Sequence, residues 1–317
     1  MKGHTKDRTA LVGAGMIGRA WAIVFASAGH PVALWDPVPG VVDGAMEFIA
    51  SQLSKLVGAG LVMEPVDTVA ARIVTAVSLE ACVAGAAYVQ ENGPEALATR
   101  RDLFARLDAL LPPETIIASS TSGMPASAFT ESLAHRERCL IAHPANPPYL
   151  LPLVELCPAP WTSGAVIERA TALLVGAGRQ VALLQKEREG FLLNRLQGAM
   201  LAEAFRLLSE GVVSVEALDT VVKHGLGLRW AFMGPIETVD LNAPGGIADF
   251  CARYAALYES LQHQMLPMAW TDAVVAPIAQ ARRQRLPQGD IAARQAWRDD
   301  ELMALAVHLA GRRDKKI

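Results

Sequence analysis

The sequence predicts a doubly wound parallel α/β sheet followed by an all-α C-terminal domain. Up to Gln185, short apolar runs alternate with longer helical patterns, which is typical of a parallel sheet covered by helices. Beyond Lys186 strand-like runs become scarce and helical patterns take over. Apolar residues make up 52% of the 317 residues and charged residues 19%, a balance that indicates a globular chain.

The expected elements follow from these patterns in chain order. The strands are expected at Thr9–Val12, Val32–Leu34, Arg72–Val77, Ala87–Gln90, Thr115–Ala118 and Cys139–His143. The helices between them are expected at Met16–Ala28, Val41–Leu56, Ala96–Leu110 and Ala165–Val175, and later ones at Phe191–Glu210, Ser214–Lys223 and Leu302–Ala310. The change from an apolar to a charged run near Gln185–Arg188 predicts a boundary between domains 1–186 and 187–317.

Composition argues against several classes of protein. The net charge is -3 and no long basic run occurs before residue 312, so the sequence gives no sign of a nucleic-acid partner. No stretch approaches the length of an apolar membrane span, and residues 1–10 are polar and unlike a signal peptide. The cysteines lack the spacing of a metal site, which favours reduced, structural thiols in a cytoplasmic protein without a metal; they are Cys82, Cys139, Cys157 and Cys251.

A glycine motif opens the first helix. It reads Gly13-Ala-Gly15-Met16-Ile17-Gly18 and follows a strand directly, as in a Rossmann-type dinucleotide site. The second expected strand runs on to Asp36, whose carboxylate suits ribose hydroxyls and repels a 2′-phosphate, so NAD is favoured over NADP. The alternative is a glycine-rich turn that binds nothing.

One histidine and one carboxylate flank a proline-rich turn. His143 ends an apolar run and Glu155 lies within the next, so two neighbouring strands joined by residues 144–148 would bring them together. A carboxylate on one imidazole nitrogen fixes the tautomer and leaves the other nitrogen as a base toward an alcohol. The alternative is a core histidine with satisfied hydrogen bonds. Ser119-Ser-Thr-Ser122 is expected at the same sheet edge, where open α/β sheets bind ligands.

Taken together, these motifs resemble the 3-hydroxyacyl-CoA dehydrogenase superfamily from about residue 8 to about residue 306. The resemblance rests on the glycine motif, Gln90-Glu-Asn-Gly-Pro-Glu95, Ser119-Ser-Thr-Ser122, His143-Pro-Ala-Asn-Pro147 with Glu155, and Gly190-Phe-Leu-Leu-Asn-Arg195. Two later stretches look like the λ-crystallin group of this superfamily: Gly225–Thr238 with Leu241-Asn242, and Ala293–Asp299.

The resemblance implies a role for each matched residue. His143 would be the general base, held by Glu155, and Ser122 and Asn194 would hydrogen-bond the reacting oxygen or the nicotinamide edge. Glu95 and Arg100 would approach the nicotinamide ribose, and Asn146 would help to seat the ring. The chain departs from the usual pattern in having Arg100 in place of lysine, which changes reach and geometry, and Glu189 in place of proline.

Arg229 is the candidate for substrate recognition. Its fork of donors suits a free carboxylate, although a structural ion pair with Glu237 or Asp240 is the alternative. The resemblance implies NAD-dependent oxidation of a free L-3-hydroxy acid, such as L-gulonate, to the 3-oxo acid. Carnitine 3-dehydrogenase, a short-chain 3-hydroxyacyl-CoA dehydrogenase and a crystallin-like, non-enzymatic NAD-binding protein stay open. An apolar helical stripe points to a homodimer and contains Leu192, Leu193, Leu196, Met200, Leu201 and Ala204.

Overall fold

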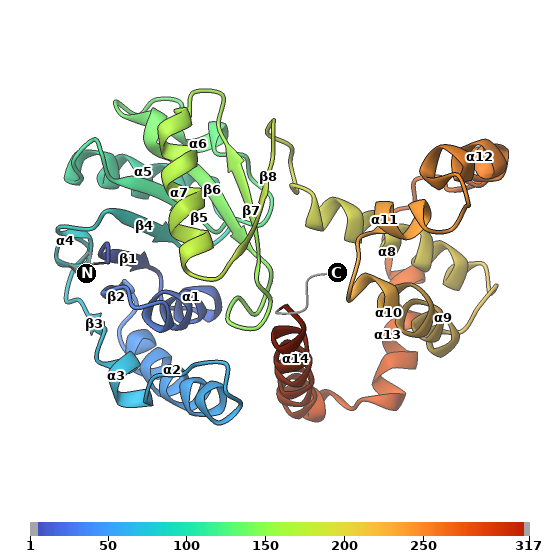
Figure 1. Cartoon of the computed structure of the whole chain (residues 1–317), viewed down its shortest axis with the longest axis horizontal. Coiled ribbons are helices and arrows are strands. Elements are labelled where there is room, and N and C mark those ends of the chain that lie inside the picture. Colours follow the sequence, from blue (N-terminus) through green and yellow to red (C-terminus); the bar gives the residue numbers. More distant parts are fainter. Residues whose placement is uncertain (1–5, 314–317) are drawn as a thin grey trace. The chain divides into compact units, whose positions relative to one another are not determined.

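The computed structural model describes residues 6–313 and contains one eight-stranded sheet (Figure 1). The strand order is β3-β2-β1-β4-β5-β6-β7-β8. The first six strands are parallel, β7 pairs antiparallel with β6, and β8 pairs parallel with β7. Their bounds are β1 Thr9–Val12, β2 Val32–Trp35, β3 Ile73–Thr75, β4 Tyr88–Glu91, β5 Ile116–Ser119, β6 Cys139–Pro144, β7 Leu153–Pro158 and β8 Gln180–Leu183.

Helices cover both faces of this sheet, as the sequence predicts. On one face lie α1 (Met16–Ser27), α2 (Val41–Gly58), α3 (Val66–Ala70) and α7 (Gly164–Gly176), around a core that includes Trp21 and Leu11. On the other face lie α4 (Leu79–Val83), α5 (Leu97–Leu110) and α6 (Ser127–Thr130), around a core that includes Phe104 and Val12. Leu11 and Val12 are neighbours in β1, and the alternation of a strand sends one to each core.

The chain divides by its contacts into two compact units. Residues up to Asn194 and those from Gln295 onward form the first unit, and Arg195–Arg294 form the second. The last helix, α14 (Ile291–Arg313), therefore belongs mainly to the first unit, where Met303 joins the core around Trp21. The expected boundary at 186 stays a prediction about the folding domains.

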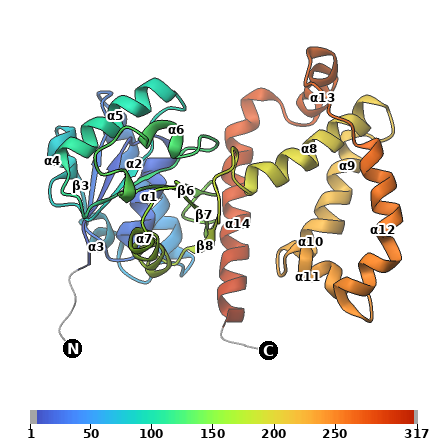
Figure 2. The same cartoon turned by 90° about the horizontal axis from the view of Figure 1, so that it is seen from above.

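The second unit is helical (Figure 2). It contains most of α8 (Leu193–Ser209), then α9 (Val215–Val221), the π-helical turn η2 (Val222–Leu226), α10 (Gly227–Trp230), α11 (Pro235–Asp240), α12 (Gly246–Gln264) and α13 (Asp272–Arg285). Few of its described side chains are buried, and the apolar ones that are exposed include Leu196, Phe232 and Leu241.

Several expected elements differ in their bounds. The third strand is shorter than Arg72–Val77, and α8 begins at Leu193, two residues after Phe191, because Phe191 has a left-handed backbone with φ 50°. Strand β8 and helices α12 and α13 were not expected; β8 is half exposed and lacks a buried apolar run, and α12 and α13 bury no residue.

The structure shows the state of the cysteines and the character of the helices in the described residues. The four cysteines are free, with Cys82, Cys139 and Cys157 buried and Cys251 exposed. Burial raises the pKa of the Cys82 and Cys139 thiols to about 12, which leaves both as inert neutral thiols. Among residues 6–313, no helix combines the length and apolar character that crossing a bilayer requires. The side chains of the basic segment 312–316 lie outside the described part.

Candidate active site

The glycine loop has the geometry of a phosphate-binding turn. Gly13 has φ +99°, and a Cβ at this position would lie 2.8 Å from the carbonyl oxygen of Asn92. A Cβ on Gly18 would lie 1.8 Å from the carbonyl oxygen of Gly13, so only glycine lets α1 start this close to the loop. Gly15, the N-cap of α1, has nothing within 4 Å of its built Cβ and no side chain caps the helix. Open space therefore lies at the free N–H groups and positive end of α1, which fits a pyrophosphate.

Asp36 stands directly after β2 and holds the glycine loop. One carboxylate oxygen accepts a hydrogen bond from the Ala14 N–H at 2.8 Å, and the other accepts one from the Val38 N–H at 2.9 Å. Each carboxylate oxygen has a second lone pair, so the side chain can still accept from two ribose hydroxyls. The residues present thus fit NAD: Gly13, Gly15 and Gly18 would hold the phosphates and Asp36 would hold the adenosine ribose.

His143 and Glu155 face one another across the antiparallel pair β6–β7, where they are register partners. His143 Nδ1 lies 2.8 Å from Glu155 Oε2, and the two residues are 5% and 1% exposed. Among the described residues His143 Nε2 has no protein partner. A carboxylate can only accept, so Nδ1 carries a proton, and in the neutral imidazole Nε2 presents a lone pair.

The second oxygen of Glu155 serves the start of α8. Glu155 Oε1 accepts hydrogen bonds from the N–H groups of Leu192 at 2.7 Å and Leu193 at 2.8 Å. Burial alone would raise the pKa of the Glu155 carboxyl, but the hydrogen bond from His143 and those from Leu193 and Leu192 outweigh it, and the pKa is lowered. Glu155 is therefore ionised at neutral pH.

Phe191 covers the histidine. Its ring centroid lies 5.4 Å from that of His143, and the side chain is fully buried. Phe191 is the one non-glycine residue with positive φ in the described chain, and such strain persists where surrounding contacts over-determine it. The strained turn directs the next two N–H groups onto Glu155, and the buried ring packs against His143.

Ser122 lies on the loop after β5 and is held from two sides. Its N–H donates to Glu95 Oε1 at 2.6 Å, and its carbonyl accepts from Asn194 Nδ2 at 2.7 Å. The hydroxyl of Ser122 has no partner among residues 6–313. Burial alone would raise the pKa of the Glu95 carboxyl, but hydrogen bonds from Ser122 and Thr121 and the charge of Arg100 lower it overall. Asn194 directly follows Leu192 and Leu193, whose N–H groups bind Glu155. The backbone therefore links the His143–Glu155 pair to the loop that carries Ser122.

Arg100 is placed differently from a side chain that faces a ligand. It is 2% exposed, and its guanidinium donates to Glu91 Oε2 at 3.1 Å, to Glu95 Oε2 at 3.2 Å and to the carbonyl of Pro94 at 3.2 Å. The structure thus brings Arg100 together with Glu95 but occupies its donors with protein acceptors. Its direct contact with NAD stays a prediction.

Asn146 connects the histidine strand to the glycine loop. Its side-chain Nδ2 lies 3.4 Å from the sulfur of Met16, at the first residue of α1. His143 lies in β6, and the loop that follows β6 therefore lies beside the glycine loop. Both are at the carboxyl edge of the sheet, where open α/β sheets bind ligands.

Arg229 belongs to the second unit, in α10. It is exposed and makes no ion pair with Glu237 or Asp240 within the described residues, so the structural alternative finds no contact to support it. The side chain of Asp240 instead accepts from the Ile247 N–H at 2.7 Å. The substrate role of Arg229 stays a prediction.

Sequence reasoning missed the buried polar groups beneath the site. Gln90 Nε2 donates to Ser120 Oγ at 2.7 Å and to the Ala142 carbonyl at 3.1 Å, and Trp21 Nε1 also donates to Ser120 at 3.1 Å. These bonds join β4, β6, α1 and the residue that follows β5. A sequence signal existed: Gln90 and Glu91 are polar residues at the end of an apolar strand, where a buried side chain needs partners.

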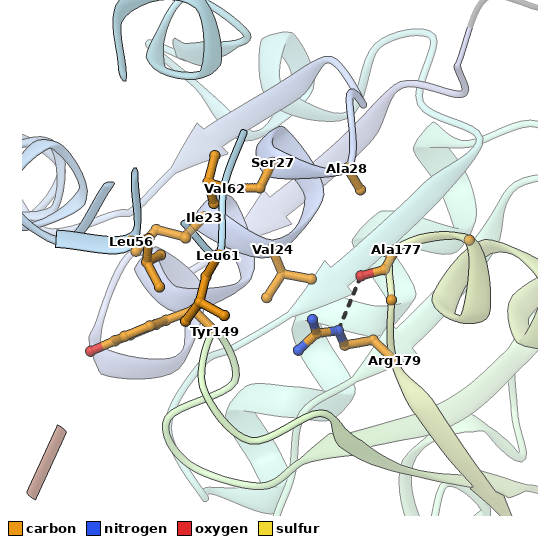
Figure 3. Close-up of a pocket in the computed structure, with 12 residues that line it drawn as sticks. Ile23, Val24, Ser27, Ala28, Leu56, Leu61, Val62, Tyr149, Ala177 and Arg179 are labelled. Atoms are coloured by element: carbon orange, nitrogen blue, oxygen red, sulfur yellow. Dashed lines mark hydrogen bonds between the residues drawn. The ribbon is translucent and has the colours of Figure 1, made fainter. Parts of the chain in front are cut away.

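A cavity of about 300 Å³ lies elsewhere in the first unit, between α1, the end of α2 and the turn before β8 (Figure 3). Apolar side chains such as Ile23, Leu56 and Val62 line it, with Arg179 at its rim donating to the Ala177 carbonyl at 3.1 Å. None of the site residues lines this cavity.

Within the described residues no cluster of acidic, His or Cys side chains could hold a metal ion.

Comparison with known proteins identifies the family of both parts of the chain. Residues 8–188 match the family model described as 3-hydroxyacyl-CoA dehydrogenase, NAD binding domain, and residues 190–276 match the C-terminal domain of the same family. A λ-crystallin homolog from Bos taurus is 42% identical over 302 residues, covering 94% of each chain. An L-carnitine dehydrogenase from Streptomyces griseus is 38% identical over 279 residues, covering 86% of this chain and 82% of that protein.

Solved structures agree on the fold. The structure of 5-formyl-3-hydroxy-2-methylpyridine 4-carboxylic acid 5-dehydrogenase, an NAD-dependent dismutase, superposes with a TM-score of 0.82 at 24% identity, covering 96% of this chain and 99% of the other. At this identity the likeness speaks for the fold alone. With two matched domains and relatives that share more than a third of their residues over most of the chain, the chain belongs to the 3-hydroxyacyl-CoA dehydrogenase family and is an NAD-dependent dehydrogenase.

Proposed function

We propose that this enzyme oxidises a free L-3-hydroxy acid, with L-gulonate as the first substrate to test, to the corresponding 3-oxo acid. The observation that carries the proposal is the buried pair of His143 and Glu155, joined at 2.8 Å with His143 Nε2 free to accept a proton. The similarity to an L-carnitine dehydrogenase, whose named substrate is a small free 3-hydroxy acid, supports a substrate of this class.

In the proposed reaction His143 Nε2 removes the hydroxyl proton of the substrate as the C3 hydrogen leaves with its two electrons. When bound, NAD supplies the acceptor for that hydride. The imidazolium that forms on His143 lies against ionised Glu155, which compensates the new charge without taking the proton itself. The Ser122 hydroxyl and the Asn194 amide are proposed to hydrogen-bond the reacting oxygen or the nicotinamide edge.

The substrate carboxylate is proposed to bind Arg229. A bidentate pair with a guanidinium would fix a small acid that lacks the long acyl-CoA chain. The exposed position of Arg229, without an acidic partner among residues 6–313, is consistent with this role. Carnitine is also a free 3-hydroxy acid, and the 38% identity to an L-carnitine dehydrogenase makes it the second candidate.

A second copy of the chain is proposed to cover the second unit. Of its residues Ala204, Thr238 and Ala243 are buried, whereas large apolar side chains such as Leu196 and Leu241 are 68% and 66% exposed. A helical unit of this size needs an apolar core, and such exposed apolar surface marks a protein interface. The proposed state is a homodimer in the cytoplasm.

The experiment compares the formation of NADH from NAD and of NADPH from NADP with L-gulonate, L-carnitine and 3-hydroxybutyryl-CoA. The proposal expects the highest kcat/KM for a free hydroxy acid with NAD. His143→Gln should lower kcat by about 10²–10⁴-fold while NAD affinity stays nearly intact. A matched control is His30→Gln, a buried histidine that hydrogen-bonds the Asp7 carbonyl. A preference for the CoA ester, or a His143→Gln enzyme that turns over normally, would contradict the proposal.

A further inference from the structure

Glu91 is a buried carboxylate to which the proposed reaction gives no role. It is the last residue of β4 and 1% exposed. Its Oε1 accepts from the Gly93 N–H at 2.6 Å, and its Oε2 accepts from Arg100 Nε at 3.1 Å and from Ser119 Oγ at 2.5 Å. The loop is built around it, since a Cβ on Gly93 would lie 2.8 Å from Glu91 Oε1. All three neighbours donate hydrogen bonds to this buried carboxyl group, so its oxygens are satisfied within the protein.

Glu91 fixes the direction of the Arg100 guanidinium. This group is planar and rigid, so the bond between its Nε and Glu91 also aims its two terminal nitrogens. Those nitrogens donate to Glu95 at 3.2 Å and to the Pro94 carbonyl at 3.2 Å. The position of the Glu95 carboxylate, whose side chain is 49% exposed, is thereby set from a pair whose side chains are each 1% exposed.

The loop after β5 receives support from Glu91 by two routes. Through Arg100, Glu91 positions Glu95, which accepts from Thr121 Oγ1 at 2.7 Å and from the Ser122 N–H at 2.6 Å. Through Ser119, whose hydroxyl donates to Glu91, it supports the Thr121 N–H, which donates to that same hydroxyl at 3.1 Å. Both routes end on the two residues that precede Gly123.

We propose that Glu91 is a positioning residue of the dehydrogenase site, an inference that rests on the proposed function. By holding Arg100 and Ser119 it fixes the backbone of Thr121 and Ser122. The Ser122 hydroxyl stands on that backbone, and the Asn194 amide is held by the Ser122 carbonyl. Glu91 itself touches neither substrate nor cofactor.

The test is Glu91→Gln. The new NH₂ group is a donor and would face one of the groups that donate to Glu91, which are the Gly93 N–H, Arg100 Nε and the Ser119 hydroxyl. Amide hydrogen exchange of residues 119–124 should become faster by about tenfold or more, because the Ser122 N–H loses a fixed acceptor. The kcat for the hydroxy acid should fall by about tenfold or more. Adding Glu95→Gln should speed exchange in residues 119–124 little further, since both changes break one chain of contacts. Unchanged exchange in these residues in Glu91→Gln, or a fully additive increase in the double variant, would overturn the inference.

The matched control is Asp108→Asn. It breaks another buried pair of the first unit, in which Arg138 Nη2 and Asp108 Oδ1 lie 2.7 Å apart with side chains 1% and 8% exposed. This control should leave exchange of residues 119–124 and kcat near wild type. If it loosens the same residues as Glu91→Gln does, the effect is general and the inference falls.

A second variant covers the case in which Glu91→Gln does not fold. Arg100→Lys keeps the charge but lacks the fork that reaches Glu91 and Glu95 together, so it should also speed exchange in residues 119–124. Protection at the wild-type level would overturn the inference. An inactive wild-type enzyme across all hydroxy acids would refute the proposed function, whereas an active wild type with unaltered Glu91→Gln and Arg100→Lys enzymes refutes this inference alone.

Discussion

Glu155 hydrogen-bonds His143 through one carboxylate oxygen and the first N–H groups of α8 through the other. One buried side chain therefore orients the proposed base and also fixes the turn from which Asn194 projects. Phe191, the residue before this turn's first N–H donor, is fully buried and places its ring against His143. The tautomer of His143 and the position of the Asn194 side chain thus both depend on the Glu155 carboxylate.

Glu155→Gln tests this shared support. The new amide has one acceptor oxygen for two sets of donors, so its NH₂ group faces either His143 or the start of α8. Against His143 it would force the proton onto Nε2 and remove the base. We expect kcat to fall by about 10²-fold or more, and the free energy of unfolding to fall by about 1–3 kcal/mol from unpaired buried groups.

Initial rates and chemical denaturation measure these two effects. Glu187→Gln is the matched control, since Glu187 also accepts from a backbone N–H, that of Ser127 at 2.9 Å. It should affect stability alone. Near-normal turnover in Glu155→Gln would show that the carboxylate is dispensable for the base.

The lowered pKa values of Glu155 and Glu95 predict acid lability. A carboxyl whose folded pKa lies below its ordinary value of 4.5 stabilises the fold at pH values above 4.5. That contribution is lost as the pH falls below 4.5 and through the folded pKa, because the unfolded chain binds protons first. Thermal unfolding should show Tm level near neutral pH and falling below about pH 4.5.

Glu95→Gln and Glu155→Gln each remove one such group. The acid limb of Tm against pH should therefore be shallower in either variant than in the wild type. A slope equal to that of the wild type in both variants would mean that other carboxyls govern acid unfolding.

The sequence was sufficient wherever local spacing sets geometry. Gly13, Gly15 and Gly18 must follow a strand at fixed intervals, and His143 and Glu155 meet because their 12-residue separation suits adjacent antiparallel strands. Ligand placement at the carboxyl edge of the sheet follows from parallel topology alone.

The sequence was insufficient wherever a side chain is placed by distant partners. The local pattern places Arg100 in the expected helix Ala96–Leu110, but its burial against Glu91 and Glu95 does not follow from that pattern. Phe191 is expected as the first residue of a helix, yet it adopts a left-handed turn, with its ring against His143 and the next two N–H groups, those of Leu192 and Leu193, on Glu155. Such effects depend on charge pairing and burial across elements, which no local pattern encodes.

Asp36→Asn tests the choice of cofactor. The amide oxygen can still accept from the Ala14 N–H, so the glycine loop should keep its shape. Loss of a charged acceptor for the ribose hydroxyls should weaken NAD binding by about 10–100-fold. Because the amide no longer repels the 2′-phosphate of NADP, the difference in affinity between NAD and NADP should become smaller. Titration calorimetry with both cofactors measures this, with the exposed Asp43→Asn as control. An unchanged NAD affinity would mean that Asp36 serves the loop alone.

Arg229→Met tests how the substrate is recognised. If Arg229 binds the carboxylate equally in the ground and transition states, KM for the hydroxy acid should rise while kcat changes little. Loss of a charge-assisted pair corresponds to about 1.5–3 kcal/mol, or roughly 10–100-fold in KM. Arg283→Met is the matched control, because Arg283 is another exposed arginine of the second unit, in α13. The idea fails if KM is the same in both variants, and a neutral substrate analogue should be insensitive to the change at Arg229.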